Sequence, residues 1–566
     1  MPEKKPSPPV EREKRTRQRK SGGISSSSKT VRQATDGKSF AKRRRPSMRA
    51  GLAVMGGRAA GAISRRLHLG GGTSIAGVVA QRLYPDIVNH LSSQLAYGSV
   101  LVTGTNGKTT TSGFIAAILS DAGLRVWRNR EGSNLMRGIA GALVIRARAG
   151  GNLRRSGQAI SIFEVDEAVV PHIIKAVPLR VAVFTNLFRD QLDRYGEVDS
   201  VSARWQQAVN ALPKNTTLVL NADDPAVASL GETYQGNVVY FGIDDASLDL
   251  VTQGISPERH QTIDTRTCAK CGNELTYTLR FYSHLGHYHC PHCGSTRPQA
   301  EVRATSITLN AFDQLRITIA TPTQQGEIVI PLPGFYNIYN ALAAIAATQA
   351  LQINWEPIVS GIQQFKPAFG RGERVQVAGR TIRILMAKNP TGFNEVLRTL
   401  FSDGEKRRVL LILNDNIADG RDVSWIWDVD FERMAQQTAS LTATGTRALD
   451  LGLRLKYAGI EPQAMSIIPL APLRADNSKD APAARMLEYK AGDAMSNGRL
   501  NGTQAAKPGV KVAQKHGLAN ALDHALQETP VGETLFVIPT YTGLLDIHRE
   551  LERRGLTPHY WEEKGP

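Results

Sequence analysis

The sequence predicts an α/β protein built from two successive wound sheets, with a small cysteine-rich insertion inside the first. Apolar strand-like runs alternate with amphipathic helical patterns from about residue 51 to 369, which is typical of a parallel sheet covered by helices. A second series of this kind starts near Arg371. All four cysteines lie between residues 268 and 293. We therefore expect an N-terminal tail (1–50), a first unit (51–369) that holds the insertion (262–300), and a second unit (370–566).

Nine short runs rich in β-branched and aliphatic residues are predicted as strands of these sheets. They are Val100–Thr103, Ile160–Val165, Val181–Phe184, Leu218–Leu220 and Val238–Phe241 in the first unit, and Ile382–Met386, Val409–Leu413, Leu441–Thr444 and Leu535–Ile538 in the second. Several of these runs end in polar residues. Because wound sheets bind their ligands at the carboxyl ends of the strands, we expect the chemistry at that edge. Residues 473–510 show no periodicity and are predicted as a flexible surface insertion.

The net charge of +18 is concentrated in the N-terminal tail. Residues 1–50 hold 16 Lys and Arg against 4 Asp and Glu, so the tail carries +12 and the remaining 516 residues carry +6. With almost no large apolar residues, the tail is expected to be disordered. It is interpreted as a solubilising arm, as a contact with an anionic membrane surface, or as a nucleic-acid-binding segment. The sequence shows neither a secretory signal nor an apolar run near the ~18 residues of a membrane span, so we expect a cytoplasmic location.

The segment GTNGKTT at 104–110 is the strongest functional signal. It lies between a predicted strand and an apolar pattern of helical period, which is the context of a phosphate-binding loop. Glycines let backbone N–H groups approach phosphates at a helix N-terminus. Lys108 is predicted to bridge the β- and γ-phosphates of ATP, and Thr109 or Thr110 to place a hydroxyl on Mg²⁺. The ATP-binding candidates in this loop are Gly104, Thr105, Asn106, Gly107, Lys108, Thr109 and Thr110.

The four cysteines have the spacing of a tetrathiolate zinc ribbon. Two CxxC pairs are separated by 18 residues, and a glycine follows each pair, where a tight turn is needed. The expected Zn²⁺ ligands are Cys268, Cys271, Cys290 and Cys293. Disulfides or free thiols are the alternatives, and His287, His289 and His292 lie close enough in the sequence to replace a thiolate. A closed tetrathiolate site is structural, and it leaves this chain without a cysteine nucleophile.

Two polar segments follow predicted strands of the first unit. In FEVDE, Glu164 is the candidate that holds Mg²⁺ against the phosphates, with a helix-capping role as the alternative. In TNLFRDQLDRYG, the site candidates are Asn186, Asp190 and Asp193, although capping would explain Asp190 equally well.

Two later segments carry further candidates. In LPGFYNIYN, Asn337 either pairs with an adenine edge or caps a helix. The loop 413–432, LNDNIADGRDVSWIWDVDFE, combines five aspartates with two tryptophans directly after a predicted strand. Loops of this kind at a sheet edge commonly bind or catalyse, and a calcium-like or capping loop is the alternative.

Together, GTNGKTT, FEVDE, TNLFRDQLDRYG, NADDP (221–225) and LPGFYNIYNALAA (332–344) resemble the ATP-dependent Mur ligase family. In that family a central ATPase domain precedes a Rossmann-like C-terminal domain. Two departures stand out. Mur ligases follow the DxxDRY segment with a carbamoylated lysine that holds a second Mg²⁺, whereas this chain has Trp205 and Gln206 there and no lysine before Lys214. It also has Gln191 in place of a metal-binding histidine, so the addition of a whole amino acid is disfavoured.

These departures, the cysteine insertion and NDNIADGRDVSWIWD resemble a narrower branch over about 51–470 and 511–566: the MurT family, synthetase subunits of lipid II isoglutaminyl synthase. The resemblance implies ATP-dependent amidation of the D-glutamate α-carboxylate in the lipid II stem peptide, through an acyl phosphate that ammonia attacks. Arg371 stands where related ligases contact the γ-phosphate. The implied cofactors are ATP, Mg²⁺ and structural Zn²⁺. The implied location is the bacterial cytoplasm, at the inner membrane face, with peripheral contact through the tail as a further hypothesis.

The same resemblance implies a partner, a separate glutaminase subunit of the GatD type that owns a Cys and a His. The synthetase of this family supplies the aspartate that completes the partner's triad, which carries over to Asp422, with Asp428 as the second choice. Two other interpretations stay open. One is a Mur- or folylpolyglutamate-type ligase that adds an amino acid, and the other is a zinc-ribbon ATPase that binds nucleic acid. The composition outside the tail does not favour a nucleic-acid partner.

Overall fold

The computed structural model describes residues 47–66, 73–129, 134–190, 198–248, 265, 267–310, 314–366, 371–470, 511–512 and 517–557. Most of the predicted tail, the predicted insertion 473–510, and the candidates Gln191 and Asp193 lie outside these residues. All nine predicted strands are present. They belong to two large sheets, and a two-stranded hairpin forms a third.

The first sheet has nine strands in the order β11-β10-β9-β6-β5-β4-β1-β3-β2. All neighbours from β9 to β2 pair in parallel, whereas β9, β10 and β11 pair antiparallel and extend one edge. The bounds are β1 Ser99–Thr103, β2 Arg125–Arg128, β3 Ala159–Glu164, β4 Leu179–Phe184, β5 Thr217–Asn221, β6 Val238–Ile243, β9 Val302–Asn310, β10 Gln314–Ala320 and β11 Gln325–Ile330. The central strands β1, β3 and β4 are apolar and almost wholly buried because helices cover both faces.

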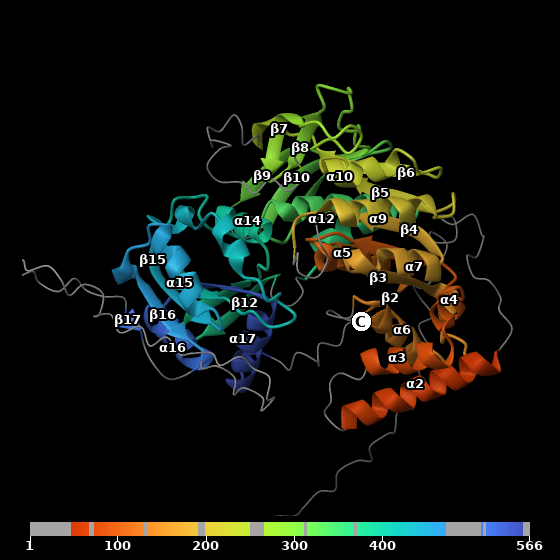
Figure 1. Cartoon of the computed structure of the whole chain (residues 1–566), viewed down its shortest axis with the longest axis horizontal. Helices are drawn as coiled ribbons and strands as arrows, with labels where there is room; N and C mark the ends of the chain where they lie inside the picture. The colour runs from red at the N-terminus through yellow and green to blue at the C-terminus, as the bar shows by residue number, and fades with distance from the viewer. Residues whose placement is uncertain are drawn as a thin grey trace, which may run out of the picture.

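Two helical layers cover this sheet. One face packs against α5 (Lys108–Asp121), α12 (Tyr336–Ala350) and α13 (Trp355–Gln363). The other packs against α4 (Ile87–Ser92), α6 (Met136–Arg146), α7 (Val170–Ala176), α9 (Val198–Asn210) and the short α10 (Pro225–Ala228). The N-terminal helices α2 (Met48–Arg66) and α3 (Thr73–Leu83) lie at the edge of the molecule beside α6 (Figure 1). Since α2 begins at Met48, the helical part of the chain starts inside the segment 1–50 that the sequence predicts as tail.

The second sheet has seven strands in the order β12-β13-β18-β14-β15-β16-β17, and only β12 is antiparallel to its neighbour. The bounds are β12 Arg371–Val377, β13 Arg380–Leu385, β14 Arg407–Ile412, β15 Thr438–Gly445, β16 Met465–Pro469, β17 Lys511–Val512 and β18 Thr534–Pro539. Helices α14 (Pro390–Leu400) and α15 (Ala448–Tyr457) cover one face, and α16 (Leu518–Gln527) and α17 (Tyr541–Arg553) the other. Figure 1 shows this half beside the first, with α14 at the side that faces the first sheet.

The cysteine insertion forms a hairpin, β7 (Thr276–Tyr282) and β8 (Leu285–His289). Its tip packs into the first half, where Phe281, Tyr282 and Leu285 are buried in the main core. The cysteines sit at the opposite end of the hairpin and form their own small cluster with Leu275 and Tyr288. Among the described residues, none of the helices combines the length and apolar character that a membrane span requires.

Candidate active site

The predicted phosphate-binding loop lies between β1 and α5, in the conformation that its glycines permit. Gly104 has φ +136° and Gly107 has φ +82°, both in the region that favours glycine. A Cβ at Gly107 would lie 1.9 Å from Oδ1 of Asn340, and one at Gly104 would lie 2.1 Å from Oγ1 of Thr185. Both positions therefore exclude any larger residue.

The loop that follows β4 holds the phosphate-binding loop in place. The side-chain oxygen of Asn186 accepts a hydrogen bond from the Asn106 N–H at 2.8 Å, and its amide donates to the Asn106 carbonyl at 3.1 Å. The Thr105 hydroxyl exchanges hydrogen bonds with the backbone of Phe188 in the same way, at 3.1 and 3.0 Å. The candidate Asn186 is thus a positioning residue for the loop backbone.

Lys108 is the first residue of α5 and points back over the loop. Its Nζ donates to the Gly104 carbonyl at 2.5 Å and to Oε2 of Glu167 at 3.2 Å. The residue is only 7% exposed, so its charge is held in a confined space at the carboxyl edge of the sheet. Glu167, from the FEVDE segment, is the carboxylate that balances it.

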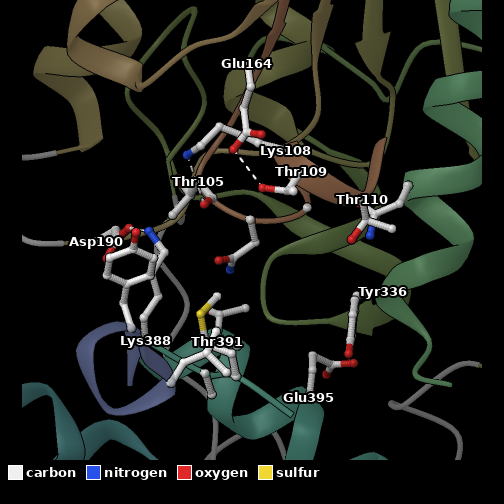
Figure 2. Close-up of a pocket in the computed structure, with 18 of the residues that line it drawn as sticks. Thr105, Lys108, Thr109, Thr110, Glu164, Asp190, Tyr336, Lys388, Thr391 and Glu395 are labelled. Atoms are coloured by element: carbon white, nitrogen blue, oxygen red, sulfur yellow. Dashed lines mark hydrogen bonds and ion pairs between the residues drawn. The ribbon is translucent and has the colours of Figure 1, made fainter. Parts of the chain in front are cut away.

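Thr109 and Glu164 form the pair that the sequence predicts for Mg²⁺. The Thr109 hydroxyl donates to Oε1 of Glu164 at 2.8 Å, and the Asn134 amide donates to the same oxygen at 3.1 Å (Figure 2). Neighbouring ligands of an octahedral Mg²⁺ at about 2.1 Å lie about 3 Å apart, so the two oxygens have the spacing of adjacent ligands. The donor set is also the hard-oxygen type that this ion prefers.

These residues open onto a cavity of about 500 Å³ between the two halves of the molecule. The first half supplies the phosphate-binding loop, including Thr110, and also Tyr336 and Asn337. The second half supplies Lys388, Thr391 and Glu395, which Figure 2 shows across the cavity from Glu164 and Thr109. Asn337 lies within α12, where its amide donates to the Pro333 carbonyl at 2.6 Å, so it is not the residue that caps the helix. Arg371 begins β12, and its side chain lies outside the described residues.

An ion pair across the cavity is a feature that the sequence does not predict. Nζ of Lys388 lies 2.5 Å from Oδ2 of Asp190, and the two side chains point toward one another in Figure 2. Burial alone lowers the pKa of the Lys388 ammonium, but the charges of Asp190 and Glu167 outweigh it, so the pKa is well above its usual value. Lys388 therefore stays charged, and its ion pair with Asp190 links the second half of the molecule to the first.

The acidic loop 413–432 places its five aspartates in different environments. Asp419 is buried against Thr542, which raises its pKa through desolvation, and Asp430 pairs with Arg433. Asp428 pairs with Arg189 at 3.0 Å, and Asp415 pairs with Arg447 at 3.2 Å.

Asp422 is exposed and makes no ion pair within the part of the chain that the structure describes. Its Oδ1 accepts the Ser424 N–H at 2.8 Å, which lowers the pKa of its carboxyl.

A second, smaller cavity has Asp422 in its lining and shares two lining residues with the first one. It has a volume of about 100 Å³, and Asp422, Asp428 and Trp425 line it together with Lys388 and Asp190. Lys388 and Asp190 therefore line both cavities. One ion pair is therefore common to the cavity of the phosphate-binding loop and to that of the exposed aspartate.

The four cysteines meet at one point, as their spacing predicts. All four sulfurs lie within 4.8 Å of one another, with 3.6 Å between Cys268 and Cys293 and 3.5 Å between Cys271 and Cys290. Sulfurs around a tetrahedral Zn²⁺ with Zn–S bonds of about 2.3 Å lie about 3.8 Å apart, so the cluster fits this ion. Gly272 and Gly294 have φ of +74° and +73°, which completes two matching turns.

The neighbouring histidines are engaged elsewhere. Nε2 of His287 lies 2.7 Å from the Ile243 carbonyl, the ring of His289 contacts the Thr276 hydroxyl, and His292 is exposed outside the cluster. The ligand set favoured by the structure is therefore the four thiolates.

The hairpin tip connects this cluster to the loop that positions Thr105. The ring of Phe188 lies 5.9 Å from that of Tyr282 and 4.9 Å from that of His284. Nε2 of His284 lies 3.3 Å from Oδ2 of Asp224, and both groups are fully buried. The guanidinium of Arg398 in α14 donates to the Phe281 carbonyl at 2.9 Å, so the tip touches both halves.

Comparison with known proteins identifies relatives by sequence. Residues 102–288 match the model of the Mur ligase middle domain, and residues 386–489 match that of the MurT ligase C-terminal domain. The chain is 35% identical over 412 residues to the lipid II isoglutaminyl synthase (glutamine-hydrolyzing) subunit MurT of Staphylococcus aureus strain COL, covering 72% of this chain and 87% of that protein. It is 31% identical over 409 residues to the subunit of the same name from Streptococcus pneumoniae R6, with the same coverage of 72% and 87%.

A solved structure shares the fold. The pseudomurein peptide ligase type C from Methanothermus fervidus superposes with a TM-score of 0.55 at 22% identity, covering 81% of this chain and 78% of that one. The likeness extends over both halves of the chain.

Proposed function

Because the chain belongs to the MurT family of Mur-type ligases, we propose that it is the synthetase subunit of a glutamine-dependent amidating enzyme. Its substrate would be the D-glutamate α-carboxylate in the stem peptide of lipid II, at the inner face of the bacterial membrane. The proposed product is D-isoglutamine, with ADP and phosphate. Residues 51–369 would form the ATP-binding domain and residues 370–566 the C-terminal domain.

The observation that carries this proposal is the shared position of Lys388 and Asp190, which line both the nucleotide cavity and the cavity of Asp422. The second cavity, of about 100 Å³, has room for ammonia, which is about the size of a water molecule, beside the ion pair that also lines the nucleotide cavity.

The phosphate-binding loop would bind ATP with its backbone N–H groups and with Lys108 on the phosphates. Thr109 and Glu164 would hold Mg²⁺, which supplies charge neutralisation on the phosphates. The substrate carboxylate attacks the γ-phosphorus, the bond to the β-phosphate oxygen breaks, and ADP leaves. Lys108 and Lys388 offset the negative charge that develops on the transferred group.

The second step converts the acyl phosphate to the amide. Ammonia attacks the acyl carbon, the C–O bond to phosphate breaks, and the nitrogen loses one proton. The activated carboxyl makes phosphate the leaving group, whereas direct amidation would require loss of an oxide. Positioning of ammonia next to the acyl phosphate matters because free ammonia is scarce at neutral pH.

The residues near the missing lysine support amidation over amino-acid addition. Trp205 is fully buried, and its indole N–H donates to the Glu167 carbonyl at 2.9 Å. The amide of Gln206 turns away to the Thr233 hydroxyl at 2.7 Å. Neither side chain is one that carbon dioxide modifies to a carbamate.

The ammonia source would be a partner glutaminase. The four cysteines of the chain meet in the cluster, which supports the view that none of them acts as a glutaminase nucleophile. Asp422 would orient the histidine of the partner. Large apolar side chains next to its loop are exposed and offer a docking surface: Trp427 at 52%, Leu449 at 61%, Leu453 at 49% and Tyr457 at 70%.

The test compares two nitrogen sources with the reconstituted pair of subunits. Asp422→Asn is expected to lower glutamine-driven amidation at least about 100-fold, because loss of a triad aspartate costs about 10⁴ in comparable enzymes, and to leave ammonium-driven amidation within about twofold. Asp428→Asn tests the second choice for this role in the same way: selective loss of the glutamine-driven reaction in Asp428→Asn, and not in Asp422→Asn, would assign the role to Asp428. Equal loss with both nitrogen sources, or ADP release that requires an amino acid, would contradict the proposal.

A further inference from the structure

Helix α2 turns its small residues inward. Its buried positions are almost all Ala, Gly or Ser, and they pack against α3 and α6. A Cβ at Gly51 would lie 2.7 Å from the Ala149 carbonyl oxygen, and one at Gly57 would lie 2.6 Å from that of Ala76. Since the backbones approach this closely, the inward face of α2 has no room for large side chains.

The large apolar side chains of α2 point the other way. Met48, Leu52, Met55 and Ile63 are 88, 59, 47 and 57% exposed, and their spacing places them on one stripe of the helix. Leu83 of α3, which is 55% exposed, adjoins the stripe beside Gly56. We call these five side chains the α2 surface. Figure 1 shows α2 at the outer edge of the first half, away from the second sheet.

The segment of the chain that carries this surface is strongly basic. Arg49, Arg65 and Arg66 are exposed on the same helix. Between Asp36 and Asp86 the sequence holds 10 Lys and Arg and neither Asp nor Glu. Residues 1–36, which precede that stretch, add 10 Lys and Arg against 4 Asp and Glu. An apolar stripe within a basic stretch of the chain is complementary to a surface that has an anionic outer layer over an apolar interior.

We propose that the α2 surface is a peripheral membrane contact that binds anionic phospholipids. The helix lies in the plane of the interface, its apolar stripe enters the boundary between headgroups and acyl chains, and the arginines reach the phosphates. The packing of α2 supports a membrane as the binding partner, because the small residues face the protein and the large apolar side chains form a continuous exposed face. This inference rests on α2 and the charge pattern, so it stands whether or not the amidation proposed above is correct.

The experiment measures binding of the full-length chain to sedimented vesicles of phosphatidylglycerol and phosphatidylcholine. The wild type is expected to bind, and vesicles of phosphatidylcholine alone should bind more weakly, by about fivefold for each arginine that reaches the surface. The variant Leu52→Ser/Met55→Ser/Ile63→Ser keeps every charge and is expected to weaken binding at least about tenfold. Its matched control is Leu449→Ser/Leu453→Ser, which removes exposed leucines from α15 and should bind as the wild type does.

A second variant separates loss of the contact from loss of the fold. Leu52→Trp places an indole where the interface favours one, so it should strengthen binding several-fold, which misfolding would not produce. The proposal is overturned if the triple serine variant binds like the wild type while deletion of residues 1–46 abolishes binding, because the tail alone would then be the contact. It is also overturned if the serine variant keeps its vesicle affinity but loses a bound protein subunit.

Discussion

The ion pair between Lys388 and Asp190 offers a direct measure of how the second sheet serves the nucleotide cavity. Replacing Lys388 by Met removes the ammonium and keeps most of the aliphatic stem. Asp190 has a side chain that is 4% exposed, so its carboxylate would remain buried without its partner. Its charge would also lie in the lining of the cavity that the phosphate-binding loop shares, where a further negative charge opposes ATP.

The size of the effect follows from the burial of the pair. Removing one partner of a buried ion pair costs about 3–5 kcal/mol. Because the Lys388 side chain keeps 27% exposure, the lower end of about 3 kcal/mol is appropriate. If that loss appears in the transition state, ammonium-driven ADP formation should fall about 150-fold in kcat/KM.

The assay is a double-mutant cycle on kcat/KM. Asp190→Asn should cost less than Lys388→Met, since the ammonium still faces the phosphates. In the double variant no uncompensated carboxylate remains, so activity should recover at least about tenfold over Lys388→Met, a coupling of at least about 1.4 kcal/mol. A double variant no better than Lys388→Met would show that the pair is not coupled and would refute the reasoning.

The pH dependence provides an independent check. The pKa of Lys388 is raised in the folded chain, so the pair is fully formed below the ordinary lysine value of about 10.4 and is lost only as pH rises through the higher folded value. The advantage of the wild type over Lys388→Met should therefore stay constant between about pH 6 and 9.

Three further changes test the remaining parts of the site. Lys108→Ala should lower ADP formation at least about 1000-fold with either nitrogen source, as measured by coupled ADP release, and retained turnover would contradict its role on the phosphates. Glu164→Gln should raise the Mg²⁺ concentration for half-maximal activity at least about tenfold, because a neutral amide replaces the charged oxygen beside Thr109; an unchanged Mg²⁺ titration would remove Glu164 as a ligand. Cys271→Ser should lower the zinc content of the purified chain well below one ion per molecule, as measured by atomic emission, whereas His292→Ala should leave it unchanged.

Local patterns in the sequence predict the parts of the site that are formed by neighbouring residues. GTNGKTT predicts the strand–loop–helix at 104–110 because glycine geometry and helix period are encoded within some fifteen residues. The two CxxC pairs predict the sulfur cluster for the same reason, since each pair forms its own turn. The pairing of Glu164 with Thr109 is also accessible from the sequence, because Glu164 ends β3, Thr109 follows β1, and these parallel neighbours share one edge of the sheet.

Long-range features were not accessible. Lys388 and Asp190 are 198 residues apart, and their contact depends on how the two halves face each other. The position of Lys388 shortly after a strand of the second sheet indicates a possible site residue, but no local pattern identifies Asp190 as its partner. The antiparallel strands β9 to β11 are not among the predicted strands, although the alternation in QLRITIA is the local signal of a half-buried strand. The outward stripe of α2 follows from close helix packing, which glycines allow but do not by themselves predict.

The hairpin that carries the cysteines has a consequence for how this protein tolerates change. Its outer end packs its cysteines against Leu275, Tyr288 and Ala228, while its tip contacts Phe188, whose backbone bonds the Thr105 hydroxyl. The hairpin therefore supports the phosphate-binding loop and could not be deleted without consequence. A shortened version would need other side chains in the space of Tyr282 and His284 to preserve the conformation of that loop. Loss of zinc would therefore be expected to weaken ATP binding indirectly, because a loosened hairpin would no longer hold the phosphate-binding loop in its conformation.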